Sequence, residues 1–160
     1  MMAESPYRVV FDCNVYFQAL ISAEGPSAKC LVVAARGEVS LFCSEQTLDE
    51  LCDVARRSDL RRKFRITDDR LTRLVEVIRA AAFFLDDVPR QFDSPRDPDD
   101  AHYVNLALAA KAKYVVSRDN DLLALMDAGR PEGREFRQRF PSLEIIEPQT
   151  LLRELNGMKQ

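Results

Sequence analysis

Histidine is almost missing from this sequence, with a single example, His102, among 160 residues. Cysteine is also sparse, and the four that are present lack the C-x-x-C spacing typical of zinc sites. These two shortages argue against a structural zinc centre built from imidazole and thiolate ligands. We expect the cysteines to be small buried hydrophobic residues of a protein in the reducing cytosol, where disulfides are rare. They are Cys13, Cys30, Cys43 and Cys52.

Long apolar runs are missing too. No stretch approaches the roughly 18 to 20 residues that a bilayer span needs. The polar segment from Met1 to Arg8 does not resemble a secretory signal. The sequence therefore predicts a cytoplasmic protein that makes no contact with a membrane.

An excess of positive charge is the third feature that the sequence lacks. Asp and Glu number 26 against 23 Lys and Arg, so the net charge is −3 and general binding to polyanions is not expected. Two local stretches are basic, and each is either a track for nucleic-acid phosphates or a solvated helix surface. Phe64 and Phe136 lie among these cations, where we expect core packing rather than base stacking. The first stretch contains Arg56, Arg57, Arg61, Arg62, Lys63 and Arg65, and the second Arg130, Arg134, Arg137 and Arg139.

What is present is the composition and length of one globular domain, with a core over about residues 7–150. Hydrophobic residues make up 46% and charged residues 31%, which is ordinary. Short apolar runs predict buried strands at residues 7–11, 39–43, 83–85, 114–116 and 143–146. Helical patterns over 15–22, 27–36, 45–55, 68–82, 100–112, 120–126 and 148–155 separate them. This alternation predicts a three-layer α/β/α domain with a central, mainly parallel sheet.

Local signals set the ends of several helices. Ser27 is the expected N-cap of the second helix and Gly37 its stop, while Ser44 is expected to cap the third. The segment 128–142 contains Gly, Pro and Arg, and we interpret it as a loop.

Carboxylates follow the strands at the sheet edge where α/β proteins bind ligands. Asp12 directly follows the first strand and Asp119 follows the fourth. Asp100 begins a buried helix, and Glu50 lies one to two turns into the helix after the second strand. Four carboxylates in one crevice would repel one another unless a cation intervened, and Mg²⁺ or Mn²⁺ prefers such oxygen ligands. We hypothesise hydrolysis by a metal-activated water, in line with the leaving oxygen.

Each acid also has a simpler explanation. Asp12 could serve only as a helix N-cap, and Asp97, Asp99 and Asp100 could complement a helix dipole. Glu50 could be an ordinary helical residue. Asp119 and Asp121 could be turn residues. A common crevice is the interpretation that explains all of these positions together.

The acidic segments resemble those of PIN-domain proteins. The resemblance rests on Val-Val-Phe-Asp-Cys-Asn-Val at 9–15, Glu-Leu at 50–51, Asp-Pro-Asp-Asp-Ala-His-Tyr-Val at 97–104 and Val-Ser-Arg-Asp-Asn-Asp-Leu-Leu at 116–123. Their order matches over nearly the whole chain, and they are most similar to the VapC-like toxin branch of bacterial and archaeal toxin–antitoxin pairs. The resemblance implies a PIN-like fold and an Mg²⁺- or Mn²⁺-dependent endoribonuclease that acts on single-stranded RNA.

The resemblance also implies roles for individual residues. The catalytic and metal-binding acids would be Asp12, Glu50, Asp100 and Asp119, with Asp97 and Asp121 as further metal contacts and Asn14 and Ser117 in support. It further implies a cognate antitoxin protein and a homodimer as partners.

Other functions remain open at this point. A receiver-type signalling domain would need a Lys near the last strand, and residues 143–148 contain none. A PIN-like module that binds RNA or protein without cutting would keep the same acids. Paired-histidine RNA cleavage is excluded by the single histidine, and His102 is expected to point away from the acids in a packing or surface role.

Overall fold

The computed structural model describes residues 7–94 and 96–158, and a single parallel sheet lies at its centre. The strand order is β3-β2-β1-β4-β5, and all four pairings are parallel. The predicted three-layer α/β/α fold with a parallel sheet is therefore confirmed. The strands are β1 (Arg8–Phe11), β2 (Ser40–Cys43), β3 (Ala82–Phe84), β4 (Tyr114–Val116) and β5 (Glu144–Ile146).

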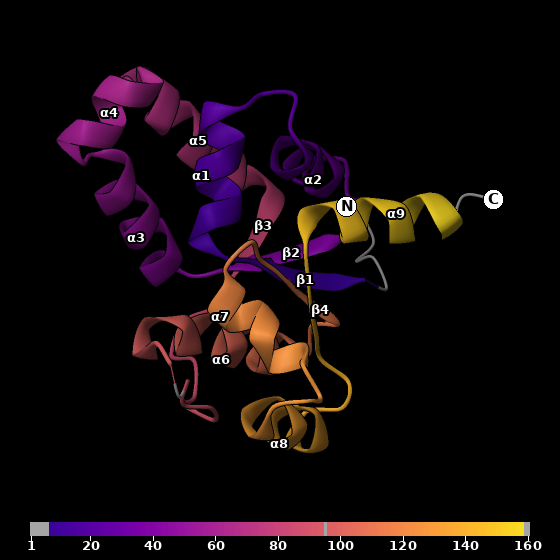
Figure 1. The fold of residues 1–160 in the computed structure, drawn as a ribbon. Coiled ribbons are helices and arrows are strands. Elements are labelled where there is room, and N and C mark those ends of the chain that lie inside the picture. Colours follow the sequence, from indigo (N-terminus) through magenta and orange to yellow (C-terminus); the bar gives the residue numbers. More distant parts are fainter. Residues whose placement is uncertain (1–6, 95, 159–160) are drawn as a thin grey trace.

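Helices cover both faces of the sheet, as Figure 1 shows. One layer holds α1 (Cys13–Ile21), α2 (Pro26–Ala35), α3 (Glu45–Ala55), α4 (Ser58–Phe64), α5 (Asp68–Ala81) and α9 (Pro148–Met158). The opposite layer holds α6 (Ala101–Ala110), α7 (Asn120–Leu123) and α8 (Pro131–Arg139), with the 3-10 turns η1 (Pro98–Asp100) and η2 (Ala124–Met126).

The core is centred on β1, the middle strand of the sheet. Val9 and Val10 are fully buried and Phe11 is 1% exposed, because helices pack against both of their faces. A run of apolar residues without alternation is what such a doubly covered strand requires. The prediction for this segment is confirmed.

Side-chain caps mark the beginnings of α1, α3, α5 and α7. Ser44 Oγ accepts a hydrogen bond from the Thr47 backbone N–H at 3.3 Å, as predicted for the start of α3. The amphipathic helix α5, which lies within the predicted helical segment 68–82, buries Leu71, Leu74 and Ile78.

The predicted start of α2 is wrong. Gly25 holds the N-cap position and Pro26 opens the helix, while Ser27 is buried within its first turn. Proline suits that place because its missing N–H would have no partner there. Gly37 follows the helix with φ of 74°, a left-handed conformation that favours glycine, so the predicted stop is confirmed.

The prediction of a loop at 128–142 is also wrong, because α8 occupies most of it. Pro131 opens the helix, and Phe136 packs against Phe92 and Phe140 with ring centroids 5.3 and 5.2 Å away. These two aromatic contacts of the buried Phe136 thus order a helix whose exposed residues are nearly all polar. Three arginines of the second basic stretch donate to backbone carbonyls, which gives them structural roles: Arg134, Arg137 and Arg139.

Two expectations from composition can be compared with the fold. All four cysteines are free thiols, three of them buried and Cys52 half-buried, so their interpretation as apolar residues is confirmed. None of the helices within 7–94 and 96–158 is long and apolar enough to cross a membrane.

Candidate active site

The topology brings two acidic segments together at the carboxyl edge of the sheet. Strands β1 and β4 are hydrogen-bonded neighbours, with Phe11 in register with Val116. The chain leaves β1 into the layer of α1 and leaves β4 into the layer of α7 (Figure 1). Such a switch point leaves a crevice between the strand ends. Asp12 lies on one side of it and the segment from Ser117 to Asp119 on the other.

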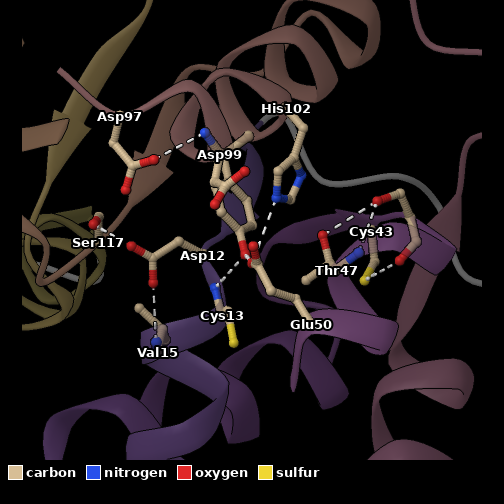
Figure 2. Close-up of polar contacts among 12 residues, drawn as sticks. Asp12, Cys13, Val15, Cys43, Thr47, Glu50, Asp97, Asp99, His102 and Ser117 are labelled. Carbon is tan, nitrogen blue, oxygen red and sulfur yellow. Dashed lines mark hydrogen bonds and ion pairs between the residues drawn. The ribbon is translucent and has the colours of Figure 1, made fainter. Parts of the chain in front are cut away.

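Asp12 is both a helix cap and part of this crevice. It is 2% exposed, and its Oδ1 accepts from the Val15 N–H at 3.1 Å while its Oδ2 accepts from the Ser117 hydroxyl (Figure 2). Burial raises its pKa to about 6, and nearby Asp119 adds to the rise, whereas the hydrogen bonds from Ser117 and Val15 oppose it. Asp12 therefore caps α1 and also lies in the crevice, and its role in catalysis stays a prediction.

Asp100 is the acid with the least compensation. It is 6% exposed at the start of α6, and its Oδ2 is buried with no hydrogen-bond partner among the described residues. Burial raises its pKa to about 7, and the negative charges of Asp119, Asp97 and Asp12 contribute further. A buried carboxylate oxygen without a donor is costly, so a cation at this position would relieve it.

Asp119 and Asp121 complete a compact group with Asp100. One carboxylate oxygen from each lies within 4.8 Å of the other two. Asp119 is held firmly, because its Oδ1 accepts from the Asp121 N–H at 2.7 Å and its own N–H donates to Ser117 Oγ at 2.9 Å. Asp121 also lies 3.3 Å from the Arg96 guanidinium. Asp121, expected only as a further contact, thus belongs to the tightest carboxylate cluster.

Glu50 reaches the same region from α3 and is held by two residues of α6. The Tyr103 hydroxyl donates to Glu50 Oε2, and His102 Nε2 lies 3.5 Å from the same oxygen (Figure 2). Burial of Glu50 favours its neutral form, but His102 and Tyr103 outweigh that effect and lower its pKa below the ordinary value. Glu50 is therefore ionised at neutral pH.

The prediction that His102 points away from the acids is wrong. Its side chain is 12% exposed and faces Glu50, because the helix that begins near Asp100 turns His102 and Tyr103 toward α3. Tyr103 was not predicted at all, although it follows Asp100 by three positions and so lies on the same helix face. The Tyr103 hydroxyl also accepts from the Cys13 N–H at 3.1 Å, which links α1, α3 and α6 around the site.

A hollow of about 170 Å³, which we call the acidic hollow, is lined by Asp12, Glu50, Asp100, Tyr103 and Asp119. Asn14 and Arg57 contribute polar groups to its wall, and Ser117 lies behind it, hydrogen-bonded to Asp12. The structure thus brings the four predicted catalytic acids to one place and adds Asp99 and Tyr103, which were not predicted there. The lining carboxylates are Asp12, Glu50, Asp97, Asp99, Asp100 and Asp119.

Comparison with known proteins identifies the family. The family model described as PIN domain matches residues 8–121, which contain every acid described above. The chain belongs to the PIN domain family. PIN domains are generally nucleases and typically use divalent metal ions, and the acidic cluster described above is consistent with both properties. This PIN domain is also similar to the uncharacterized protein MJ1680 of Methanocaldococcus jannaschii, with 26% identity over 150 residues that cover 87% of this chain and 95% of the relative.

The donor set of this PIN domain fits a hard divalent cation. Carboxylate oxygens are the ligands that Mg²⁺ and Mn²⁺ prefer. The buried, unpartnered Oδ2 of Asp100 lies within the cluster where such an ion would provide its missing partner.

Proposed function

We propose that this PIN domain is an endoribonuclease that hydrolyses phosphodiester bonds of RNA with Mg²⁺ or Mn²⁺ bound in the acidic hollow. The observation that carries the proposal is the group formed by Asp100, Asp119 and Asp121, in which a buried carboxylate oxygen has no donor. Asp12 lies beside this group and shares Ser117 with Asp119 as a hydrogen-bond partner.

The acids divide into two sets by their environment. Asp12, Asp100 and Asp119 would hold the ion, since the pKa values of the first two are raised and a cation would favour their ionised forms. A bound ion of this kind lowers the pKa of a coordinated water and neutralises charge on the reacting phosphate. Glu50 is already ionised and is oriented by Tyr103, so it can accept a proton from a water aimed at the phosphorus.

A substrate can reach the acidic hollow along the first basic stretch. Arg57 lines the hollow, and the exposed Arg56, Arg62, Lys63 and Arg65 continue from the end of α3 over α4. Arg61 is less available to bind a phosphate, because it already forms an ion pair with Asp68 at 2.9 Å. We assign this surface to the phosphates of the RNA strand, whose charge would otherwise be repelled by the acids.

The biological setting follows from the sequence resemblance alone. We propose that the protein acts in the cytoplasm as the toxin of a toxin–antitoxin pair, with a cognate antitoxin protein covering the acidic hollow. A homodimer is part of the same proposal.

The test compares the wild type with Asp119→Asn and with the exposed control Asp69→Asn on labelled single-stranded RNA. We expect cleavage in Mn²⁺ or Mg²⁺, none in EDTA, and a roughly 100-fold or larger loss in Asp119→Asn, since even lost outer-shell partners cost 10- to 100-fold. The control should match the wild type. Thermal unfolding with and without Mn²⁺ shows whether each variant is folded and still binds the ion.

The main alternative is a PIN module that binds RNA or protein without cutting. It would show no metal-dependent cleavage by the folded wild type, and Asp12→Asn would leave binding of the RNA panel unchanged. That pair of results would contradict the proposed nuclease.

A further inference from the structure

A second and larger cavity, of about 530 Å³, lies beside the acidic hollow, and we call it the side cavity. The helices α3 and α6 contribute different residues to each of them. On α3, Gln46 faces the side cavity and Glu50, one turn later, faces the acidic hollow. On α6, His102 lines the side cavity while Tyr103 lines the hollow, and the Glu50–His102 contact at 3.5 Å lies between them.

We propose that the side cavity receives one unpaired base of the RNA strand, from the nucleotide next to the bond that is cut. The inference rests on the proposed function, which places the reacting phosphate in the acidic hollow. Because the two spaces adjoin along α3 and α6, a strand with its phosphate in one has its neighbouring nucleoside at the mouth of the other. A volume of this size is in the range of small-molecule sites.

The lining suits a flat ring with a polar edge. Leu85, Val88, Ala101 and Leu106 offer apolar surface for the faces of a base. His102 supplies the polar contact, because both of its ring nitrogens are buried and neither has a hydrogen-bond partner among the described residues. Nε2 is directed at Glu50, whereas Nδ1 is buried without a partner, so a ligand would bond Nδ1 after a small rotation of the ring toward the side cavity. A buried ring nitrogen of this kind is expected to have a partner in the functional complex.

The charges on the rim favour a base over a phosphate. Arg90 is paired with Asp93 at 2.6 Å, and Glu45 is paired with Arg79 at 2.6 Å. Asp86 and Asp87 lie at the rim, exposed, and no ion pair is found for either among residues 7–94 and 96–158. Two carboxylates repel a phosphate but accept hydrogen bonds from amino groups. Adenine, cytosine and guanine carry such groups and uracil does not, so uracil is the least suitable base.

The cavity is shaped before any ligand enters. Asn105 is buried, and its Oδ1 accepts from the backbone N–H groups of Gln91 and Phe92, both at 2.8 Å. Its Nδ2 donates to the Phe92 carbonyl at 3.1 Å. These bonds fix the loop that forms one wall, so little ordering is needed on binding. A base inside a duplex could not enter without leaving its stack, which restricts the site to single-stranded RNA.

The experiment places one abasic ribose at each position in turn of a single-stranded RNA 12-mer that the wild type cuts. In the wild type we expect kcat/KM to fall about tenfold at one position next to the cleaved bond, in line with the value of a stacked base. Cytosine should be preferred over uracil at that position.

Two variants close the side cavity: Gln46→Trp from α3 and Val88→Trp from the loop. In both, the position-specific effect of the abasic ribose should shrink below twofold, while the matched control Gln138→Trp, exposed on α8, should retain it. An equal effect in the wild type and in both folded blocking variants would overturn the proposal.

The same series separates this proposal from the nuclease itself. If the wild type and Asp119→Asn both fail to cut, the nuclease is wrong, and fluorescence anisotropy in Mn²⁺ then measures binding of the labelled 12-mers. A position-specific loss of affinity that Gln46→Trp and Val88→Trp abolish would support the side cavity as a base site. A loss that is equal at all positions would overturn it.

Discussion

Tyr103 is the residue on which the geometry of Glu50 depends most directly. Its hydroxyl donates to Glu50 and accepts from the Cys13 N–H, in a place that is 3% exposed. We expect Tyr103→Phe to raise the pKa of Glu50 and to destabilise the fold by roughly 2 to 3 kcal/mol, because two hydrogen bonds are lost, one of them to a carboxylate. The acidic limb of the pH–rate profile should move to higher pH, and urea unfolding measures the stability. An unchanged profile would show that Tyr103 has only a packing role.

Asp12 and Asp100 make the stability of the metal-free protein depend on pH. Their pKa values in the fold are about 6 and about 7, above the ordinary value of 3.8, so the folded state binds protons more tightly than the unfolded chain. The contribution of these two groups to the free energy of unfolding therefore increases as the pH falls through those values. In EDTA, we expect the thermal midpoint to rise from pH 8 to pH 5.

The variant Asp100→Asn is the control for this pH dependence. Its thermal midpoint in EDTA should rise less between pH 8 and pH 5 than that of the wild type. Mn²⁺ should act in the opposite sense, raising the midpoint most at pH 8, because the ion binds ionised carboxylates. A midpoint in EDTA that falls between pH 8 and pH 5 would contradict the pKa values given to this pair.

At the scale of elements, α8 depends on close contact with the turn before it. A Cβ on Gly133 would lie 2.0 Å from the backbone oxygen of Asp127, so the helix would have to move away. We expect Gly133→Ala to cost roughly 1 to 3 kcal/mol, as overpacking generally does. The control is Gly157→Ala in α9, where a Cβ meets nothing within 4 Å and alanine should be neutral or slightly stabilising. Urea unfolding compares both variants, and equal stabilities would contradict this packing.

At the scale of the whole molecule, a protein of net charge −3 must bind a polyanion through a local surface. If the first basic stretch carries the phosphates, removing three of its cations should reduce the magnitude of the log–log salt slope by about 2. The variant combines Arg56→Gln, Arg62→Gln and Lys63→Gln. Its control removes the same charge from exposed residues in and directly after α2 and in α9, with Lys29→Gln, Arg36→Gln and Arg153→Gln. Equal slopes for the two variants would assign this stretch to solvated surface.

The sequence by itself determined the class of fold and the segments that carry the acids. Buried strands such as 9–11 and caps such as Ser44 are set by residues close together in the chain, and their patterns are visible without coordinates. A parallel sheet then places Asp12 and Asp119 at one edge, because the carboxyl ends of its strands lie on the same side.

Only the tertiary structure decided the features that depend on contacts between distant segments. Helix α8 forms because Phe136 packs on Phe92, 44 positions earlier, whereas its own composition resembles a loop. His102 turns toward Glu50 across the gap between α3 and α6. The unpartnered oxygen of Asp100 and the side cavity likewise exist only where separate elements meet. Their physical cause is burial and packing in three dimensions, which local sequence patterns do not encode.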